Sequence, residues 1–294
     1  MAATFPLIPR RRVLGLAFGG LHSARRGHGS DVAASRPYRP GDDVGKIDWS
    51  ASARLSLARG TDEFIVREHF AEEAPRVVVL SDRRPSMSVF GEEWPWLRKP
   101  EAIRQSVRLI GDSAVAARGL LGYFDEGEEA PFWHPPRSEG ELGRLDLERP
   151  FGAPDDTLVH GLRYLIEQRR DLPAGTFLFV LSDFLVQPER DDWLWALERR
   201  WEIVPVVIQD PIWEQSFPDV AGMVIPFEQA GLVRLSAAEV AQRRESNEER
   251  RRDLLYDLRA LDLDPVLVSS HEPRDVLFSF LSWADQRLFT RGRA

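Results

Sequence analysis

The pattern of apolar positions predicts a long series of alternating strands and helices after a polar, turn-rich beginning. Two continuous apolar runs, residues 77–80 and 177–181, are typical of strands buried on both faces of a parallel sheet. Between these runs, one helical stripe at spacings of four, three and four is formed by Ile103, Val107, Ile110 and Ala114. The alternation predicts an α/β fold, a mainly parallel sheet with helices on both faces.

The same pattern predicts the other elements of this fold. The expected strands are residues 76–82, 119–124, 130–134, 176–183, 201–208 and 265–269, with a short strand pair near 222–235. The expected helices are residues 157–170, 189–199, 237–260 and 273–289. The first of these helices follows Asp155 and Asp156, either of which is placed to cap it.

Residues 1–75 differ from the rest and are expected to form a small β-rich segment ahead of an α/β domain at residues 76–294. Prolines and glycines punctuate this segment, and residues 56–70 are interpreted as a hairpin that turns at residues 60–62. The segment begins with several arginines and an apolar run at residues 13–21. These only superficially resemble a twin-arginine export signal, because the run contains three glycines and no small-residue cleavage site follows it.

Composition excludes several classes of function. The chain has no cysteine, so disulfides, thiolate metal sites and cysteine nucleophiles are ruled out. A net charge of −8 disfavours binding to nucleic acid. No apolar run of about 18 residues is present, so we expect no membrane span and a cytoplasmic protein. A phosphate-binding loop and the Gly-x-Ser-x-Gly elbow of α/β-hydrolases are both absent from the sequence.

Candidate chemistry lies where two buried strands end. Asp82 follows the first strand and Asp183 follows a later one, and the carboxyl ends of neighbouring parallel strands meet at one edge of the sheet. With the hydroxyls of Ser86 and Thr157, these carboxylates can supply the oxygen ligands that Mg²⁺ prefers. The alternative is that both acids cap helices or close turns. Spacing alone leaves these two interpretations open.

A long motif in the N-terminal segment resembles the signature of the domain of unknown function 58 (DUF58) family. It consists of an arginine, a tyrosine, a Pro-Gly-Asp-Asp turn, Ile-Asp-Trp and Ser-Ala-Arg. Its residues here are Arg36, Tyr38, Gly41, Asp42, Asp43, Asp48, Trp49 and Arg54. We interpret Asp42 or Asp43 as a capping residue of the turn at Pro40 and Gly41, and Trp49 as a packing anchor, with a binding surface as the less favoured alternative.

The resemblance implies a von Willebrand A-like fold with a metal-ion-dependent adhesion site at the carboxyl edge of the sheet. Such sites bind a partner's carboxylate through the metal. Members of the family are often associated with AAA+ ATPases of the MoxR type, in assembling or remodelling other proteins. No enzymatic activity is established for the family, so the resemblance implies a protein-binding role.

The sequence departs from the adhesion-site motif, Asp-x-Ser-x-Ser, because Arg84 stands in place of the first serine. A guanidinium cannot coordinate a cation, although it can neutralise Asp82 and Asp183 through charge-assisted hydrogen bonds. The threonine loop is also altered, with Asp156 at the position expected for the ligand and Thr157 one residue later. We therefore expect a degenerate site with weak or no Mg²⁺ binding. A surface position in a loop is the alternative for Arg84.

Three hypotheses follow. The first is a non-enzymatic protein-interaction module, an adaptor for a MoxR-type ATPase, whose surface comprises residues 82–86, 155–157 and 183–184 and includes Arg84 and Phe184. The second is a metal-dependent hydrolase that uses Asp82, Asp183 and the Asp42–Asp43 turn as a carboxylate cluster. The third is a structural homologue without a surviving site.

Overall fold

The computed structural model describes residues 3–10, 26–39, 44–60, 64–70, 74–88, 97–127, 131–137, 145, 147–227 and 231–291. At its centre is a six-stranded sheet with the order β10-β7-β6-β3-β4-β5. The strands are β3 (Arg76–Ser81), β4 (Leu120–Asp125), β5 (Phe132–Arg137), β6 (Phe177–Ser182), β7 (Glu202–Ile208) and β10 (Val266–Val268). Neighbouring strands are parallel except at the edge, where β5 runs antiparallel to β4.

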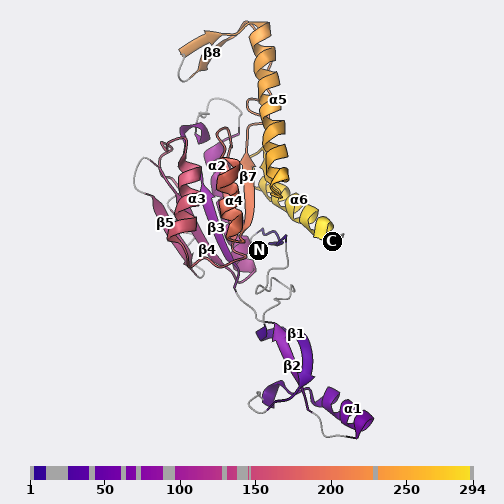
Figure 1. Cartoon of the computed structure of the whole chain (residues 1–294). Coiled ribbons are helices and arrows are strands. Elements are labelled where there is room, and N and C mark those ends of the chain that lie inside the picture. Colours follow the sequence, from indigo (N-terminus) through magenta and orange to yellow (C-terminus); the bar gives the residue numbers. More distant parts are fainter. Residues whose placement is uncertain are drawn as a thin grey trace.

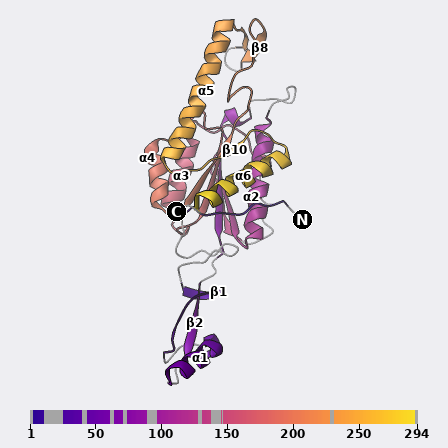
Figure 2. The same ribbon diagram turned by 90° about the vertical axis from the view of Figure 1, so that its right-hand side faces the viewer.

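Helices cover both faces of the sheet, as the alternation of strands and helices predicted (Figures 1 and 2). On one face, α2 (Lys99–Ala116) and α6 (Pro273–Arg291) pack in one apolar core with inward side chains of the strands. On the other face, α3 (Thr157–Gln168) and α4 (Arg190–Glu198) share a second core with the end of α5 (Ala237–Ala260). The expected α/β class, a Rossmann-like mainly parallel sheet, is confirmed.

Helix α3 approaches the sheet closely because Gly161 has no side chain. A Cβ atom built there would lie 2.5 Å from Leu80 Cδ1 and 3.2 Å from Phe124 Cε1. Both of those side chains are buried in the sheet. The contact fixes α3, and with it the loop before Thr157, against the carboxyl ends of β3 and β4.

Residues 3–10 pack against the α/β body, so the N-terminal segment of 75 residues is not a single unit. Phe5 is buried against Phe179, Phe280 and Trp283, and its backbone N–H donates to Ser113 Oγ at 3.0 Å. We call residues 3–10 the N-terminal strap. These residues pack in the apolar core of the α/β body, although the expected boundary at residue 75 assigned them to the N-terminal segment.

The described elements between residues 26 and 70 form a small module at the end of the molecule from which β3 starts (Figure 1). It contains β1 (Arg26–Pro37), η1 (Val44–Lys46), α1 (Trp49–Arg59) and β2 (Ile65–Phe70). β1 pairs with β2 in antiparallel register. We call these elements the signature module, because they carry the family motif.

The expected hairpin over residues 56–70 is wrong. Helix α1 includes the first part of this range, and only β2 is a strand. The side chain of Asp48 accepts a hydrogen bond from the Ala51 N–H and starts the helix, and Gly60 ends it in a left-handed conformation with φ of 66°. The alternation of leucine and serine at residues 55–57 resembles the apolar–polar pattern of a strand. The two helix caps, at Asp48 and Gly60, determine the local structure instead.

An arm extends beyond the opposite, carboxyl edge of the sheet (Figures 1 and 2). It consists of the long helix α5 and the hairpin of β8 (Val224–Phe227) and β9 (Gly231–Arg234). Phe217, Leu235 and Val240 form a small core where the hairpin meets the start of α5. The sequence predicted this strand pair and helix correctly. Among the described residues, no helix is both long and apolar enough to cross a membrane.

Candidate functional site

The two acid-tipped strands lie side by side, as the sequence predicted. β3 and β6 are parallel neighbours, and the Asp82 N–H donates to the carbonyl of Leu181 at 2.9 Å. The residues that follow the two strands, Asp82 and Asp183, are fully buried. Their carboxylates therefore converge at the carboxyl edge of the sheet.

Arg84 lies between these two carboxylates. Its Nη2 is 2.6 Å from Asp82 Oδ2 and 3.0 Å from Asp183 Oδ1, and its backbone N–H donates to Asp82 Oδ1 at 2.8 Å. Burial lowers the pKa of Arg84, but its hydrogen bonds and ion pairs with the aspartates outweigh burial and raise the pKa. With an exposed fraction of 2%, Arg84 is not a surface loop residue. It holds the two acids together.

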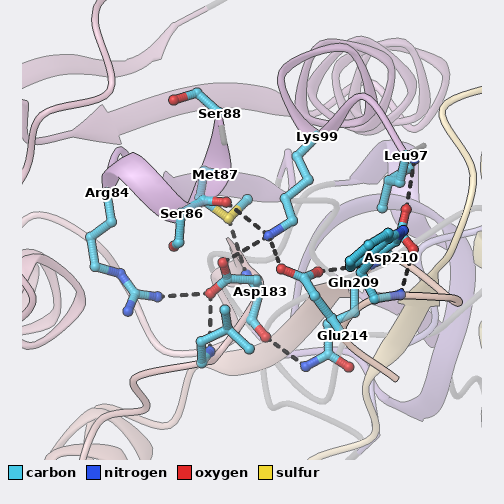
Figure 3. Close-up of polar contacts among 12 residues, drawn as sticks. Arg84, Ser86, Met87, Ser88, Leu97, Lys99, Asp183, Gln209, Asp210 and Glu214 are labelled. Atoms are coloured by element: carbon cyan, nitrogen blue, oxygen red, sulfur yellow. Dashed lines mark hydrogen bonds and ion pairs between the residues drawn. The ribbon is translucent and has the colours of Figure 1, made fainter. Parts of the chain in front are cut away.

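Lys99 is a second internal cation, which the sequence analysis missed. Its Nζ donates to Asp183 Oδ2 at 3.0 Å and to the Ser86 carbonyl at 2.8 Å, and it also pairs with Glu214 (Figure 3). Lys99 is the first residue of α2 and is buried. A lysine that begins a helix usually reaches solvent, so nothing in its sequence context signalled this position.

The cations set the charge states of the acids around them. Burial raises the pKa of Asp183, but Lys99, the Leu185 N–H and Arg84 together hold that pKa below its ordinary value. Burial raises the pKa of Glu214 despite Lys99, and the neighbouring charge of Asp183 raises it further. We call Asp82, Arg84, Lys99, Asp183 and Glu214 the buried ion network.

A separate polar cluster lies on the next strand along the sheet. Arg83 Nε donates to Asp125 Oδ2 at 2.8 Å, and Arg149 pairs with the other oxygen of the same carboxylate. The Tyr123 hydroxyl donates to Asp125 at 2.9 Å, and burial raises the pKa of this tyrosine. Successive arginines of the altered motif thus neutralise different carboxylates.

The remaining expected ligands are not arranged around a common centre. The Ser86 hydroxyl lies beside Asp183 and lowers its pKa, yet it makes no hydrogen bond of normal geometry. The Thr157 hydroxyl donates to the Glu126 carbonyl at 3.4 Å. The Asp156 side chain is 58% exposed and pairs with His160 at 3.1 Å. Asp156 begins α3 without a side-chain cap, contrary to one sequence expectation.

These residues do not fit a divalent cation. Guanidinium and ammonium groups already contact the carboxylates of Asp82, Asp183 and Glu214, and a fixed positive charge at that distance repels a metal ion. In the part of the chain that the structure describes, no group of three or more histidine, aspartate or glutamate side chains could hold a metal. We therefore assign no chemistry to a metal here.

The two residues expected to contact a partner are not on the surface. Arg84 is enclosed by the buried ion network. Phe184 is 2% exposed, packs against Trp193 and adopts a left-handed backbone conformation with φ of 51°. Phe184 is a core residue that turns the chain after β6. Both side chains are buried in this structure, and the expected partner contact through them stays a prediction.

The described signature residues lie far from the ion network, in the module beyond the amino ends of the strands (Figure 1). Gly41, Asp42 and Asp43 fall outside the described residues. The carboxylate cluster required by the hydrolase hypothesis is therefore not assembled from described residues.

The other signature residues have clear places in this module. Asp48 caps α1, and Arg54 Nε donates to the Ser50 carbonyl at 3.2 Å. The Tyr38 N–H donates to the Phe64 carbonyl at 2.8 Å, and Arg36 is in register with Val66. Trp49 is 60% exposed, so its expected role as a packing anchor is wrong.

Comparison with known proteins identifies the class. The profile of the family described as "Protein of unknown function DUF58" matches residues 34–254, well over half of the chain. The chain belongs to this family. Uncharacterized proteins of Mycobacterium tuberculosis and Mycobacterium bovis are each 25% identical to it over 251 residues, covering 79% of this chain and 71% of theirs.

Solved structures show weaker similarity. The conserved hypothetical protein BatB from Bacteroides thetaiotaomicron is 10% identical, with a TM-score of 0.40, over 75% of this chain and 100% of BatB. An aerotolerance-related membrane protein from Bacteroides fragilis is 9% identical, with a TM-score of 0.37, over 72% of this chain and 99% of that protein. Similarity at this level does not bear on function.

Proposed function

We propose that this chain is a non-enzymatic protein-interaction module of von Willebrand A-like type, in which two internal cations replace the metal of an adhesion site. The observation that carries the proposal is the contact of Arg84 and Lys99 with Asp183 from opposite sides, at 3.0 Å each. Because the carboxylates are neutralised inside the protein, the carboxyl edge of the sheet is held rigid without a metal.

The proposed binding surface is the exposed rim above the buried ion network. Val186 and Ile212 are large apolar residues on this rim, with exposed fractions of 43% and 49%. Asp155, in the loop before α3, is exposed as well. The proposed partner is a MoxR-type AAA+ ATPase, on the ground of the family resemblance, with the chain acting as its adaptor in protein assembly or remodelling.

Calorimetric titration with Mg²⁺ and Mn²⁺ tests the replacement of the metal. The wild-type chain should give no saturable heat. Arg84→Ser restores the Asp-x-Ser-x-Ser pattern and removes one cation, so this variant should gain Mg²⁺ binding, more so in combination with Lys99→Met. Arg83→Ser is the matched control, because Arg83 pairs with Asp125 and not with the network. Saturable binding by the wild type together with hydrolytic turnover would refute the proposal.

Co-purification with a co-expressed MoxR-type AAA+ ATPase tests the interaction itself. Val186→Asp and Ile212→Asp place a charge on the rim and should abolish the association. Phe289→Asp changes an even more exposed apolar residue, on α6, and should leave the association intact. Association that survives both rim substitutions would remove the carboxyl edge as the binding surface.

A further inference from the structure

The signature module presents an exposed apolar surface that its own fold does not explain. Asp48 is accounted for as the cap of α1, and Ser52 is accounted for as a link between α1 and β2, because its hydroxyl accepts from the Ile65 N–H at 2.8 Å. Trp49 has no comparable structural role. Its ring meets that of Phe64 edge to face at 5.8 Å, and both residues remain exposed.

Trp49 is the start of an apolar stripe along α1. Residues four apart lie on one face of a helix, so Trp49, Ala53 and Leu57 follow one another along the same side. The exposed fractions are 60% for Trp49, 87% for Leu57 and 43% for Phe64, and Ala53 is exposed as well. We call Trp49, Ala53, Leu57 and Phe64 the α1 ridge. It is about 12 Å long at 1.5 Å per residue, two turns of helix.

The ionisable side chains of helix α1 are all basic. The helix contains Arg54 and Arg59 and no acidic residue. The nearest preceding acid in the described chain, Asp48, is engaged by the N–H of Ala51 at the helix start. The whole chain has a net charge of −8, so this helix is opposite in sign to the molecule that carries it. An acidic partner is attracted to it, and a basic one is repelled.

We propose that the α1 ridge docks an acidic amphipathic helix of a partner protein, with apolar side chains against Trp49 and Leu57 and carboxylates facing Arg54. A tryptophan and an arginine on neighbouring turns of one helix match the residue types enriched in interface hot spots. The apolar face of a partner helix suits a ridge of this length. Three large apolar side chains are a small area for holding a bilayer, which favours a protein partner over a membrane surface.

The test is selection from a phage library of random 20-residue peptides against the full chain, with counter-selection against Trp49→Ala. Peptides whose binding depends on the ridge should combine leucine or aromatic residues at helical spacing with aspartate or glutamate. Their affinity should fall at least about tenfold on Trp49→Ala or Leu57→Ser. Arg54→Glu should weaken them by roughly fivefold and should strengthen basic peptides.

Phe278→Ser is the matched control, because Phe278 is a 70% exposed apolar residue on α6, and it should leave binding unchanged. Circular dichroism and hydrogen exchange of α1 establish that the ridge variants remain folded. A selection that yields no ridge-dependent peptide, or yields basic ones, overturns the proposal. So does ridge-dependent binding to vesicles containing 30% phosphatidylserine with no peptide selected, which would assign the ridge to a membrane. The rim variants Val186→Asp and Ile212→Asp should not affect peptide binding, so failure here is distinct from failure at the carboxyl edge.

Discussion

Individual ionised residues in this protein are stabilised by one another rather than by water. Asp183 has Arg84 on one side and Lys99 on the other, and each of the three is at least 98% removed from solvent. Removing one charge from such a buried set costs far more free energy than the complete set contributes to stability, because the charge left behind has neither solvent nor partner. Single substitutions in the buried ion network should therefore have large effects on stability.

Lys99→Met leaves Asp183 and Glu214 without their ammonium partner. We expect a loss of about 3–5 kcal/mol in the free energy of unfolding, measured by urea denaturation at neutral pH. Arg104→Met is the control, because Arg104 pairs with Glu101 at the surface of the same helix, and it should cost at most about 1 kcal/mol. Equal losses from the two substitutions would mean that the lysine is solvated.

The two acids that contact Lys99 should respond to pH with opposite sign. The pKa of Asp183 is held below its ordinary 3.8, so its contribution to stability is present above that pH and is lost as the pH falls through the lower folded pKa. The pKa of Glu214 is raised above its ordinary 4.5, mainly by burial. Its contribution is complete below that pH and is lost as the pH rises through the higher folded pKa.

We expect Asp183→Asn to flatten the fall in the free energy of unfolding below about pH 4, and Glu214→Gln to remove a decline above about pH 4.5. Urea denaturation at a series of pH values measures both. Parallel pH profiles for the wild type and the two variants would show that neither carboxyl group is perturbed.

Sequence patterns predicted the acids of the network but not all of its cations. Asp82 and Asp183 were found because each ends a continuous apolar strand, and Arg84 because it breaks a known motif. Lys99 and Glu214 come from a helix start and a loop, and only the packing of α2 on the sheet brings them together with Asp183. Contacts of this kind depend on distances between elements that no local pattern contains.

At the scale of elements, apolar periodicity predicted the α/β body well and the signature module poorly. Buried strands and stripes of three or four apolar residues determine the body, and β3, β6, β7, α3, α4 and α5 lie within a few residues of their expected bounds. Helix α1 has no buried stripe, because its apolar face is exposed as the α1 ridge. Its structure depends on the Asp48 cap, a signal shared with ordinary turns.

The packing of α3 on the sheet depends on the absence of a side chain at Gly161. Alanine has a higher helix propensity than glycine, but at this position its methyl group would overlap Leu80 in a filled core. We expect Gly161→Ala to lower the free energy of unfolding by about 1–2 kcal/mol, measured by urea denaturation. Gly127→Ala meets its nearest neighbour at an ordinary 3.5 Å and serves as the control. A stabilised Gly161→Ala would mean that α3 can move outward freely.

The whole molecule has its two recognisable motifs at opposite ends of one sheet. The buried ion network lies at the carboxyl edge beside the arm, and the signature module extends beyond the amino ends of the strands (Figure 1). The two proposed contact surfaces, the rim and the α1 ridge, are therefore separated by the length of the sheet. Two partners, or two parts of one large partner, can bind without competing.

The N-terminal strap packs in the apolar core of the α/β body. Phe5→Ala removes a ring buried among three aromatic side chains, so we expect a loss of about 3–5 kcal/mol in the free energy of unfolding. Phe289→Ala, at a 78% exposed position, should cost less than about 0.5 kcal/mol. Thermal and urea denaturation both measure the difference, and similar values for the two would place the strap outside the cooperative unit.

The strap also determines when during synthesis the core can be completed. Arg287 donates to the carbonyl of Ile8 at 3.0 Å, a contact across 279 residues, and Phe280 and Trp283 of α6 cover Phe5. A ribosome makes on the order of 5–20 residues per second, so the first apolar residues wait many seconds for the helix that buries them. Until α6 emerges, the nascent chain lacks the helix that covers Phe5 and Phe179, so this core is completed only late in synthesis.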